Sequence, residues 1–427
     1  MKNIYFDYAG TTPIDEKVAE EMKRVLDKKD GLFGNPSSLN IFGQRASALL
    51  DNSRERVAKM IGANYREIIF TSGATEANNL IIRGIVKSYF RRNNQRLTTN
   101  DLRQGQDEEK RTYADGEKIC GGGIPKVIVS SIEHPSILET VRDIEKDGSI
   151  RAVYLKVDKN GVVDIEELKK ELDEKTILVS VMWVNNEVGT VEPIREISKI
   201  ISEFKKKNNN GYPIFHSDAV QAFNYYDLNV IKSGVDAMTL SGHKIYGPKG
   251  VGALYLSSKF KVQSSKLGEG EKYSKIVPIM TGGGQENGMR SGTENILGIL
   301  GLAKAMEIAT EKTRDESVRI NELRNYLFDK IKEKLDKIEI NGSFEKSAPH
   351  ILSLFVPYKE NLHISLDMEG MSVSTGSACS QKMLKPSHVL LAMGYDEKRS
   401  KNTIRISLGR WTTKEEIDEL VGKIVGK

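Results

Sequence analysis

The strongest chemical pattern in the sequence is a lysine that follows an apolar run and a glycine turn. Ser241, Gly242, His243 and Lys244 come directly after the apolar residues 237–240. A lysine amine placed there can be desolvated and so kept neutral enough to form a Schiff base with an aldehyde. For this motif taken alone, the alternative is an ordinary turn whose lysine points into solvent.

An aspartate follows a second apolar run. Asp218 comes at the end of the run 213–217. A carboxylate in that position can pair with the protonated pyridine nitrogen of a pyridoxal cofactor and make the ring a better electron sink. Capping of the next helix is the alternative role for this aspartate.

A third segment, residues 71–79, passes from a predicted strand through a glycine turn into a helix. The free N–H groups at the start of that helix suit a phosphate, and the Thr75 hydroxyl can add a donor. A capping box of Ser72 or Thr75 with Glu76 is the alternative. All three motifs end a strand, where open α/β sheets bind ligands, so together they predict a pyridoxal phosphate site.

The elements that position these motifs form an α/β pattern. Short apolar runs alternate with helical segments, which predicts a mainly parallel sheet with crossover helices. An apolar stripe that includes Phe42, Leu50 and Val57 predicts a helix packed on this sheet. The predicted strands of the sheet are 67–71, 126–131, 152–157, 177–184, 213–217, 237–241 and 252–256.

Two domains are expected from the length of 427 residues. We place a large α/β domain at 14–260 and a smaller α+β domain at 1–13 together with 261–427, because the polar stretch 259–275 has the composition of a boundary. The amphipathic segment 294–337 predicts one or two helices. Residues 91–123 are polar, rich in glycine and without apolar periodicity, which predicts an exposed loop inserted in the large domain.

Composition excludes several classes of function. The formal charge of +5 comes from 64 basic and 59 acidic residues with no long block of one sign, so we expect no nucleic-acid partner. No apolar run is long enough to span a bilayer, and we expect no membrane association. The 2 cysteines lack metal-ligand spacing and are too few for a disulfide framework. A soluble, cytoplasmic protein without a metal site is therefore predicted.

The chain resembles cysteine desulfurases of the class-V aminotransferase family, which use pyridoxal 5′-phosphate. The resemblance runs from Tyr-Phe-Asp-Tyr-Ala at 5–9, through Gly-Asn-Pro at 34–36 and the segment 71–79, to Ser-Leu-Gly-Arg at 407–410. It implies the fold type I architecture of pyridoxal-phosphate-dependent transferases for the large domain. It also implies a homodimer that takes L-cysteine as substrate.

The resemblance implies a role for individual residues. Lys244 would carry the cofactor, and His134 would stack on its ring and help to move protons. Arg405 would bind the substrate carboxylate, a bidentate task that suits a guanidinium, with Asn35 and Asn186 also near the substrate. The implied cofactor-binding set is Lys244, Asp218, Gln221, Ala74, Thr75, Asn186, Ser241, Gly242, His243 and, from the partner subunit, Thr293.

A small, polar, glycine-containing segment at 374–381 holds Cys379. Its composition predicts a mobile loop whose thiol can enter a site, attack sulfur and carry it out, whereas a buried structural cysteine is the alternative. The family resemblance implies that Cys379 is catalytic. The continuation at 384–390 resembles the long-loop branch, which supplies sulfur for iron–sulfur cluster assembly and tRNA thiolation.

The expected reaction converts L-cysteine to L-alanine and leaves a persulfide on Cys379. The expected partners are sulfur-acceptor proteins, such as an iron–sulfur scaffold or a tRNA-thiolation enzyme. Two other functions remain open at this point. One is a selenocysteine lyase of the same fold, and the other is a non-catalytic subunit that binds a sulfur-transfer partner.

Overall fold

The computed structural model describes residues 3–100, 111–112, 118–119, 123–209, 211–260, 275–357, 359–376 and 386–426. Its centre is a seven-stranded sheet in the order β2-β10-β9-β8-β7-β5-β6, in which β10 alone runs antiparallel to its neighbours. The strands are β2 (Ile68–Thr71), β5 (Lys126–Ser130), β6 (Arg151–Leu155), β7 (Thr176–Ser180), β8 (Ile214–Asp218), β9 (Ala237–Ser241) and β10 (Gly252–Leu256). The predicted fold class is confirmed.

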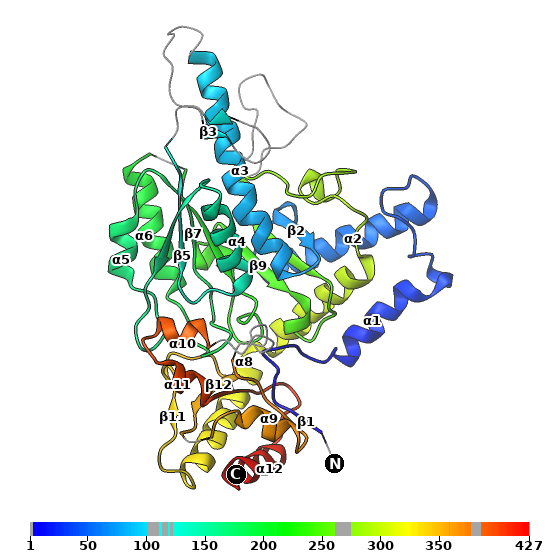
Figure 1. The fold of residues 1–427 in the computed structure, drawn as a ribbon. Helices are drawn as coiled ribbons and strands as arrows, with labels where there is room; N and C mark the ends of the chain where they lie inside the picture. The colour runs from blue at the N-terminus through cyan, green and yellow to red at the C-terminus, as the bar shows by residue number, and fades with distance from the viewer. Residues whose placement is uncertain are drawn as a thin grey trace.

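Helices cover both faces of this sheet (Figure 1). Residues that alternate along a strand point to opposite faces, so Ile69 of β2 packs in one core and Phe70 in the other. One core includes α3 (Ala74–Asn100) and α4 (Pro135–Lys146). The other includes α2 (Ile41–Met60), α5 (Ile165–Glu171), α6 (Ile194–Lys207) and α8 (Ile296–Lys332).

A smaller sheet lies beside the large one, and both ends of the chain lie near the smaller sheet (Figure 1). Its antiparallel strands are β11 (Glu339–Ile340), β12 (Ile351–Phe355) and β14 (Thr403–Ser407), in that order. Next to it, β1 (Ile4–Tyr5) pairs in parallel with β13 (Met371–Ser372). The remaining helices are α1 (Glu16–Leu26), α7 (Val230–Ser233), α9 (Leu362–Asp367), α10 (His388–Ala392), α11 (Glu397–Lys401) and α12 (Lys414–Val425).

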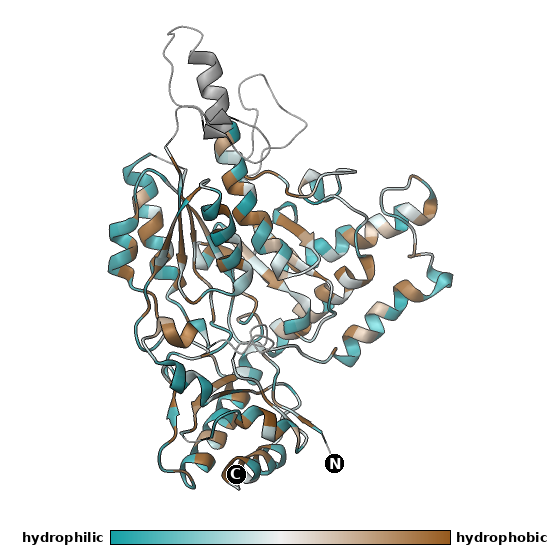
Figure 2. Cartoon of the chain, in the orientation of Figure 1, coloured by the Kyte–Doolittle hydropathy of each residue, from teal (hydrophilic) through white to brown (hydrophobic). Residues whose placement is uncertain are grey.

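Hydropathy follows these layers. Figure 2 shows hydrophobic residues along the central strands and hydrophilic ones on the outer surfaces of the helices. None of the helices in the described ranges has both the length and the apolar composition needed to cross a lipid bilayer.

Two details of the sequence interpretation need correction. The segment 91–123 does not begin as a loop, because α3 continues to Asn100, and β3 (Arg111–Thr112) and β4 (Lys118–Ile119) form a short antiparallel pair after it. The stripe of α2 packs chiefly along α8 rather than on the sheet. Phe42 is 42% exposed, where it stacks on Phe33.

A buried ion pair ties the edge strand β2 to the rest of the protein. Arg54 and Glu286 form two hydrogen bonds of 2.7 Å each. The same Arg54 donates to the Ile68 carbonyl oxygen, and Glu286 accepts from the Phe70 N–H. Both side chains are almost fully buried, so removing either charge leaves the other without compensation.

We expect Glu286→Gln to lower the free energy of unfolding by about 3–5 kcal/mol, because the Arg54 charge stays buried without its partner. The matched control is Glu307→Gln, which breaks the more exposed pair with Arg56 and should cost about 1 kcal/mol or less. Urea unfolding of the two variants measures the difference. Equal losses would contradict the role given to the buried pair.

Candidate active site

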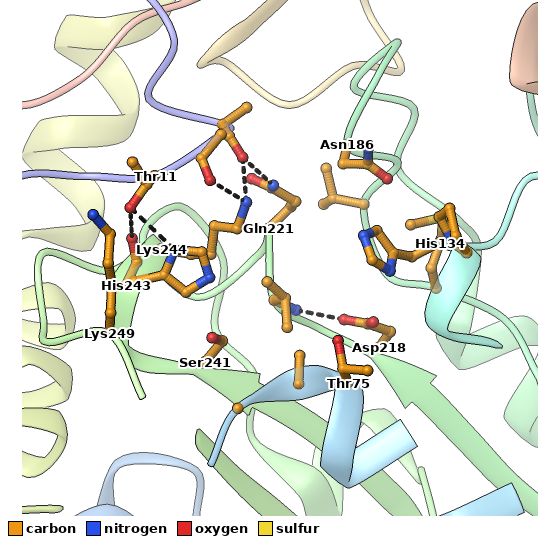
Figure 3. A pocket seen from close by; sticks show the side chains of 18 of the residues that line it. Thr11, Thr75, His134, Asn186, Asp218, Gln221, Ser241, His243, Lys244 and Lys249 are labelled. Atoms are coloured by element: carbon orange, nitrogen blue, oxygen red, sulfur yellow. Dashed lines mark hydrogen bonds between the residues drawn. The ribbon is translucent and has the colours of Figure 1, made fainter. Parts of the chain in front are cut away.

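Most of the predicted site residues line one cavity at the carboxyl ends of the parallel strands, as open α/β sheets require. The cavity measures about 540 Å³. Figure 3 shows side chains from several distant segments that point into it. The predicted residues along its wall are Ala74, Thr75, His134, Asn186, Asp218, Gln221, Ser241, His243, Lys244 and Arg405.

Lys244 ends a short 3₁₀ helix that follows β9. Its Nζ donates hydrogen bonds to the carbonyl oxygens of Ala9, at 2.5 Å, and Gly10, at 2.7 Å (Figure 3). The Ala9 oxygen also accepts from the Gln221 side chain. The amine is therefore held at the cavity wall by the N-terminal segment of the chain.

Asp218 is the last residue of β8 and is 5% exposed. Its Oδ2 accepts a 2.8 Å hydrogen bond from Asn78 Nδ2, and its Oδ1 accepts from the Val220 N–H. These two donors hold the carboxylate in one orientation at the cavity wall. A carboxylate held in this way can pair with a protonated ring nitrogen.

The start of α3, on the wall of the same cavity, has the features of an anion site. Helix α3 begins at Ala74, directly after Gly73 with φ of +153°. A Cβ built on Gly73 would meet nothing within 4 Å, so space is open beside the first turn of the helix. The first N–H groups of a helix lack intrahelical partners and attract phosphate. Ser241 and His243 line the same cavity.

His243 is held as a neutral imidazole. Burial lowers its pKa to about 4, and the positive charges of Lys244 and Lys249 add to the effect. Its Nδ1 lies 3.1 Å from Thr11 Oγ1. At neutral pH this histidine therefore supplies a polar contact rather than a positive charge.

Arg405 comes from β14 of the smaller sheet and is 2% exposed. Its Nη2 pairs with Asp7 at 2.6 Å, and its Nη1 donates to the carbonyl oxygens of Asn186 and Gly376. Its buried Nε has no partner among the described residues. A guanidinium has five donors, so capacity remains for a carboxylate.

Three predicted residues within the described ranges do not line the cavity. Gly242 is buried at the start of the 3₁₀ helix. Asn35 is exposed, where its Oδ1 accepts from the Ser37 N–H, and Thr293 is also exposed. Cys379 lies outside the described residues.

Residues that the sequence interpretation gave no role also belong to this site. Asp7 holds Arg405, Asn78 holds Asp218, and the carbonyl oxygens of Ala9 and Gly10 hold Lys244. Of these residues, only Asn78 has a sequence pattern that could have identified it. It lies four residues after Ala74, which places both on the same side of the helix.

A mainly parallel sheet with a lysine, a carboxylate and a helix start on one cavity defines a pyridoxal-phosphate enzyme of fold type I. Comparison with known proteins agrees. The family model for aminotransferase class-V matches residues 4–101 and 124–420. The chain belongs to this family, and the expected cofactor, pyridoxal 5′-phosphate, is confirmed by that membership.

Relatives and solved structures are similar over almost the whole chain. A protein named cysteine desulfurase IscS, from Dictyoglomus turgidum, is 40% identical over 419 residues, which cover 98% of this chain and 92% of the relative. A solved NifS-like protein has a TM-score of 0.81 and 34% identity, with coverage of 100% and 99%. The structure titled SspA in complex with cysteine has a TM-score of 0.73 and 31% identity, with coverage of 96% and 99%.

A buried histidine next to the site makes stability depend on pH. His216 of β8 bridges Ser180 of β7 and Thr239 of β9, at 2.9 and 3.0 Å. Burial lowers its pKa to about 3. An unfolded histidine has a pKa of about 6.5, so between these values the unfolded chain binds more protons and stability falls as the pH falls.

We expect the contribution of His216 to the free energy of unfolding to fall by about 2 kcal/mol between pH 7 and pH 5. His216→Gln should therefore lose less stability over this interval than the unchanged protein. His363→Gln, at a half-buried site, is the control and should keep the original dependence more closely. Urea unfolding at both pH values measures the effect. The prediction is wrong if His216→Gln and the unchanged protein show the same pH dependence.

Proposed function

We propose that this protein is a cysteine desulfurase that converts L-cysteine to L-alanine and takes the sulfur onto Cys379. The observation that carries the proposal is the convergence of Lys244, Asp218 and Arg405 on one cavity. The first two residues suit the cofactor, and the third suits the carboxylate of an amino acid. Names of similar proteins support the choice of substrate, since one relative is a cysteine desulfurase and one similar structure holds cysteine.

Each residue has a task that follows from its place. The first turn of α3, with Thr75, Ser241 and His243, would hold the phosphate, and Asp218 would hold the ring nitrogen. When bound, pyridoxal phosphate supplies an electron sink for the carbon skeleton of the substrate. Arg405 orients the substrate by its carboxylate.

Lys244 is the proposed attachment point for the cofactor and the base for the substrate Cα proton. Its amine needs a place while it is not covalently engaged. The carbonyl oxygens of Ala9 and Gly10 offer such a place at the cavity wall.

Cys379 is the proposed sulfur acceptor. Its thiolate would attack the sulfur of the substrate, so that an S–S bond forms while the C–S bond breaks and its electron pair stays with carbon. Gly376 lines the cavity. Cys379 is three positions further along the chain, so the covalent chain alone keeps its Cα within roughly 11 Å of the Gly376 Cα. The sulfur would then pass to an acceptor protein of iron–sulfur assembly or tRNA thiolation in the cytoplasm.

We expect Cys379→Ala to bind the cofactor with the usual yellow colour but to yield little alanine or sulfide from L-cysteine. Lys244→Ala is the matched variant, and it should lose both the covalent attachment of the cofactor and turnover. Product assays and absorption spectra measure these outcomes. Full turnover by Cys379→Ala with selenocysteine but not cysteine would favour a selenocysteine lyase. Protein that stays colourless with added cofactor would favour the binding subunit.

We further propose that the protein is a homodimer. Five exposed apolar residues lie between the end of α1 and the start of α2, and Leu39 among them is 93% exposed. Apolar patches of this kind on soluble proteins mark interfaces. Asn35 and Thr293 are exposed outside their own cavity, which is what residues that serve the cavity of a second copy require. The surface consists of Leu26, Phe33, Leu39, Ile41 and Phe42.

We expect the double variant Phe33→Asp and Leu39→Asp to shift the protein from dimer to monomer, because two buried charges would oppose association. The control is Ile231→Asp, at an apolar residue of α7 that is 80% exposed, which should leave the dimer intact. Sedimentation velocity gives the masses. An unchanged dimer in the double variant would exclude this surface as the interface.

A further inference from the structure

His134 does two things at once, because it lines the cavity and also caps a helix. It is the N-cap of α4, and its Nδ1 accepts a hydrogen bond from the Ser136 backbone N–H at 3.1 Å. A backbone N–H can only donate, so Nδ1 cannot carry a proton in this arrangement. The hydrogen of the neutral imidazole is therefore on Nε2.

The Ser136 hydroxyl adds a second donor to the same nitrogen. Its Oγ lies 2.9 Å from His134 Nδ1 and accepts a 2.9 Å hydrogen bond from Asn78 Nδ2. Asn78 uses its other N–H on Asp218 Oδ2. The carboxylate only accepts, which orients the Asn78 amide with its nitrogen towards Asp218 and leaves the hydroxyl hydrogen of Ser136 for His134.

The surroundings of the His134 imidazole also favour its neutral form. Burial lowers the pKa of His134, and the charges of Lys244 and His388 lower it further, while Asp218 opposes them. These groups come from three different elements, the 3₁₀ helix after β9, α10 and β8. The positive end of the α4 dipole also lies next to Nδ1 and disfavours a charged ring. Neutral imidazole is the form that this site stabilises.

We infer that Ser136 and Asn78 are positioning residues that hold His134 as a neutral imidazole with its hydrogen on Nε2. His134 then meets the contents of the cavity as a hydrogen donor, and the task of base falls to Lys244. This consequence for catalysis rests on the proposed function, whereas the protonation state of the ring does not.

Nuclear magnetic resonance of the full-length protein, carrying its cofactor and ¹⁵N-labelled histidine, tests the inference directly. The chain has 6 histidines, and the signal of His134 is identified by its loss in His134→Asn. We expect a protonated Nε2 and an unprotonated Nδ1 between about pH 6 and 8. A proton on Nδ1 in this range, in either a neutral or a charged ring, would overturn the inference.

A variant separates the effect of the Ser136 hydroxyl from that of the Ser136 backbone N–H. Ser136→Ala should raise the ratio of charged to neutral His134 about two- to tenfold at a given pH, the effect of one lost hydrogen bond. Ser136→Thr should restore it. The control is Thr140→Val on the same helix, since that buried hydroxyl bonds the Ser136 carbonyl oxygen rather than His134.

The outcomes distinguish this inference from the proposed function. Unchanged His134 protonation in Ser136→Ala would remove Ser136 from the positioning role, whatever the activity. A protein that fails to desulfurise cysteine but shows the expected ring tautomer would instead refute the proposed function alone.

Discussion

The site depends on the way a short N-terminal segment closes onto the ends of the parallel strands. The carbonyl oxygens of Ala9 and Gly10 accept from Lys244, while Asp7 pairs with Arg405. Thr12 completes the closure by hydrogen bonds with the backbone of His243 and Tyr246. Buried polar groups without hydrogen-bond partners cost free energy, so these contacts hold the segment in this position. The six residues 7–12 thus set the distance between the Lys244 amine and the Arg405 guanidinium, on which the chemistry depends.

Sequence analysis predicted the scaffold well because its signals are local. Seven apolar runs became the seven strands of the large sheet, and Asp218 ends β8 as expected. Each motif follows a strand, and the rule that ligands bind at the carboxyl ends then brings the motifs together. The roles expected of residues such as His134 and Arg405 came from the family resemblance, since no local pattern could have given them.

Other features could not be predicted, for physical reasons that differ from case to case. The contacts of Lys244 join residues more than 200 positions apart and use backbone oxygens, which every residue type carries. Phe42 satisfied the helical period of α2 but is exposed, because periodicity identifies a face and not what covers it. The continuation of α3 to Asn100 could not be predicted, because the sequence from 91 to 100 has no apolar period.

Helix α8 has a consequence for how the protein moves. Its first half packs in the core of the large sheet, through residues such as Leu302 and Met306, and its second half packs in the core of the smaller sheet, through Leu323 and Leu327. A hinge between the two sheets would have to bend or break a continuous helix of 37 residues. The helix therefore connects the two cores along its length and opposes a swing of one sheet against the other.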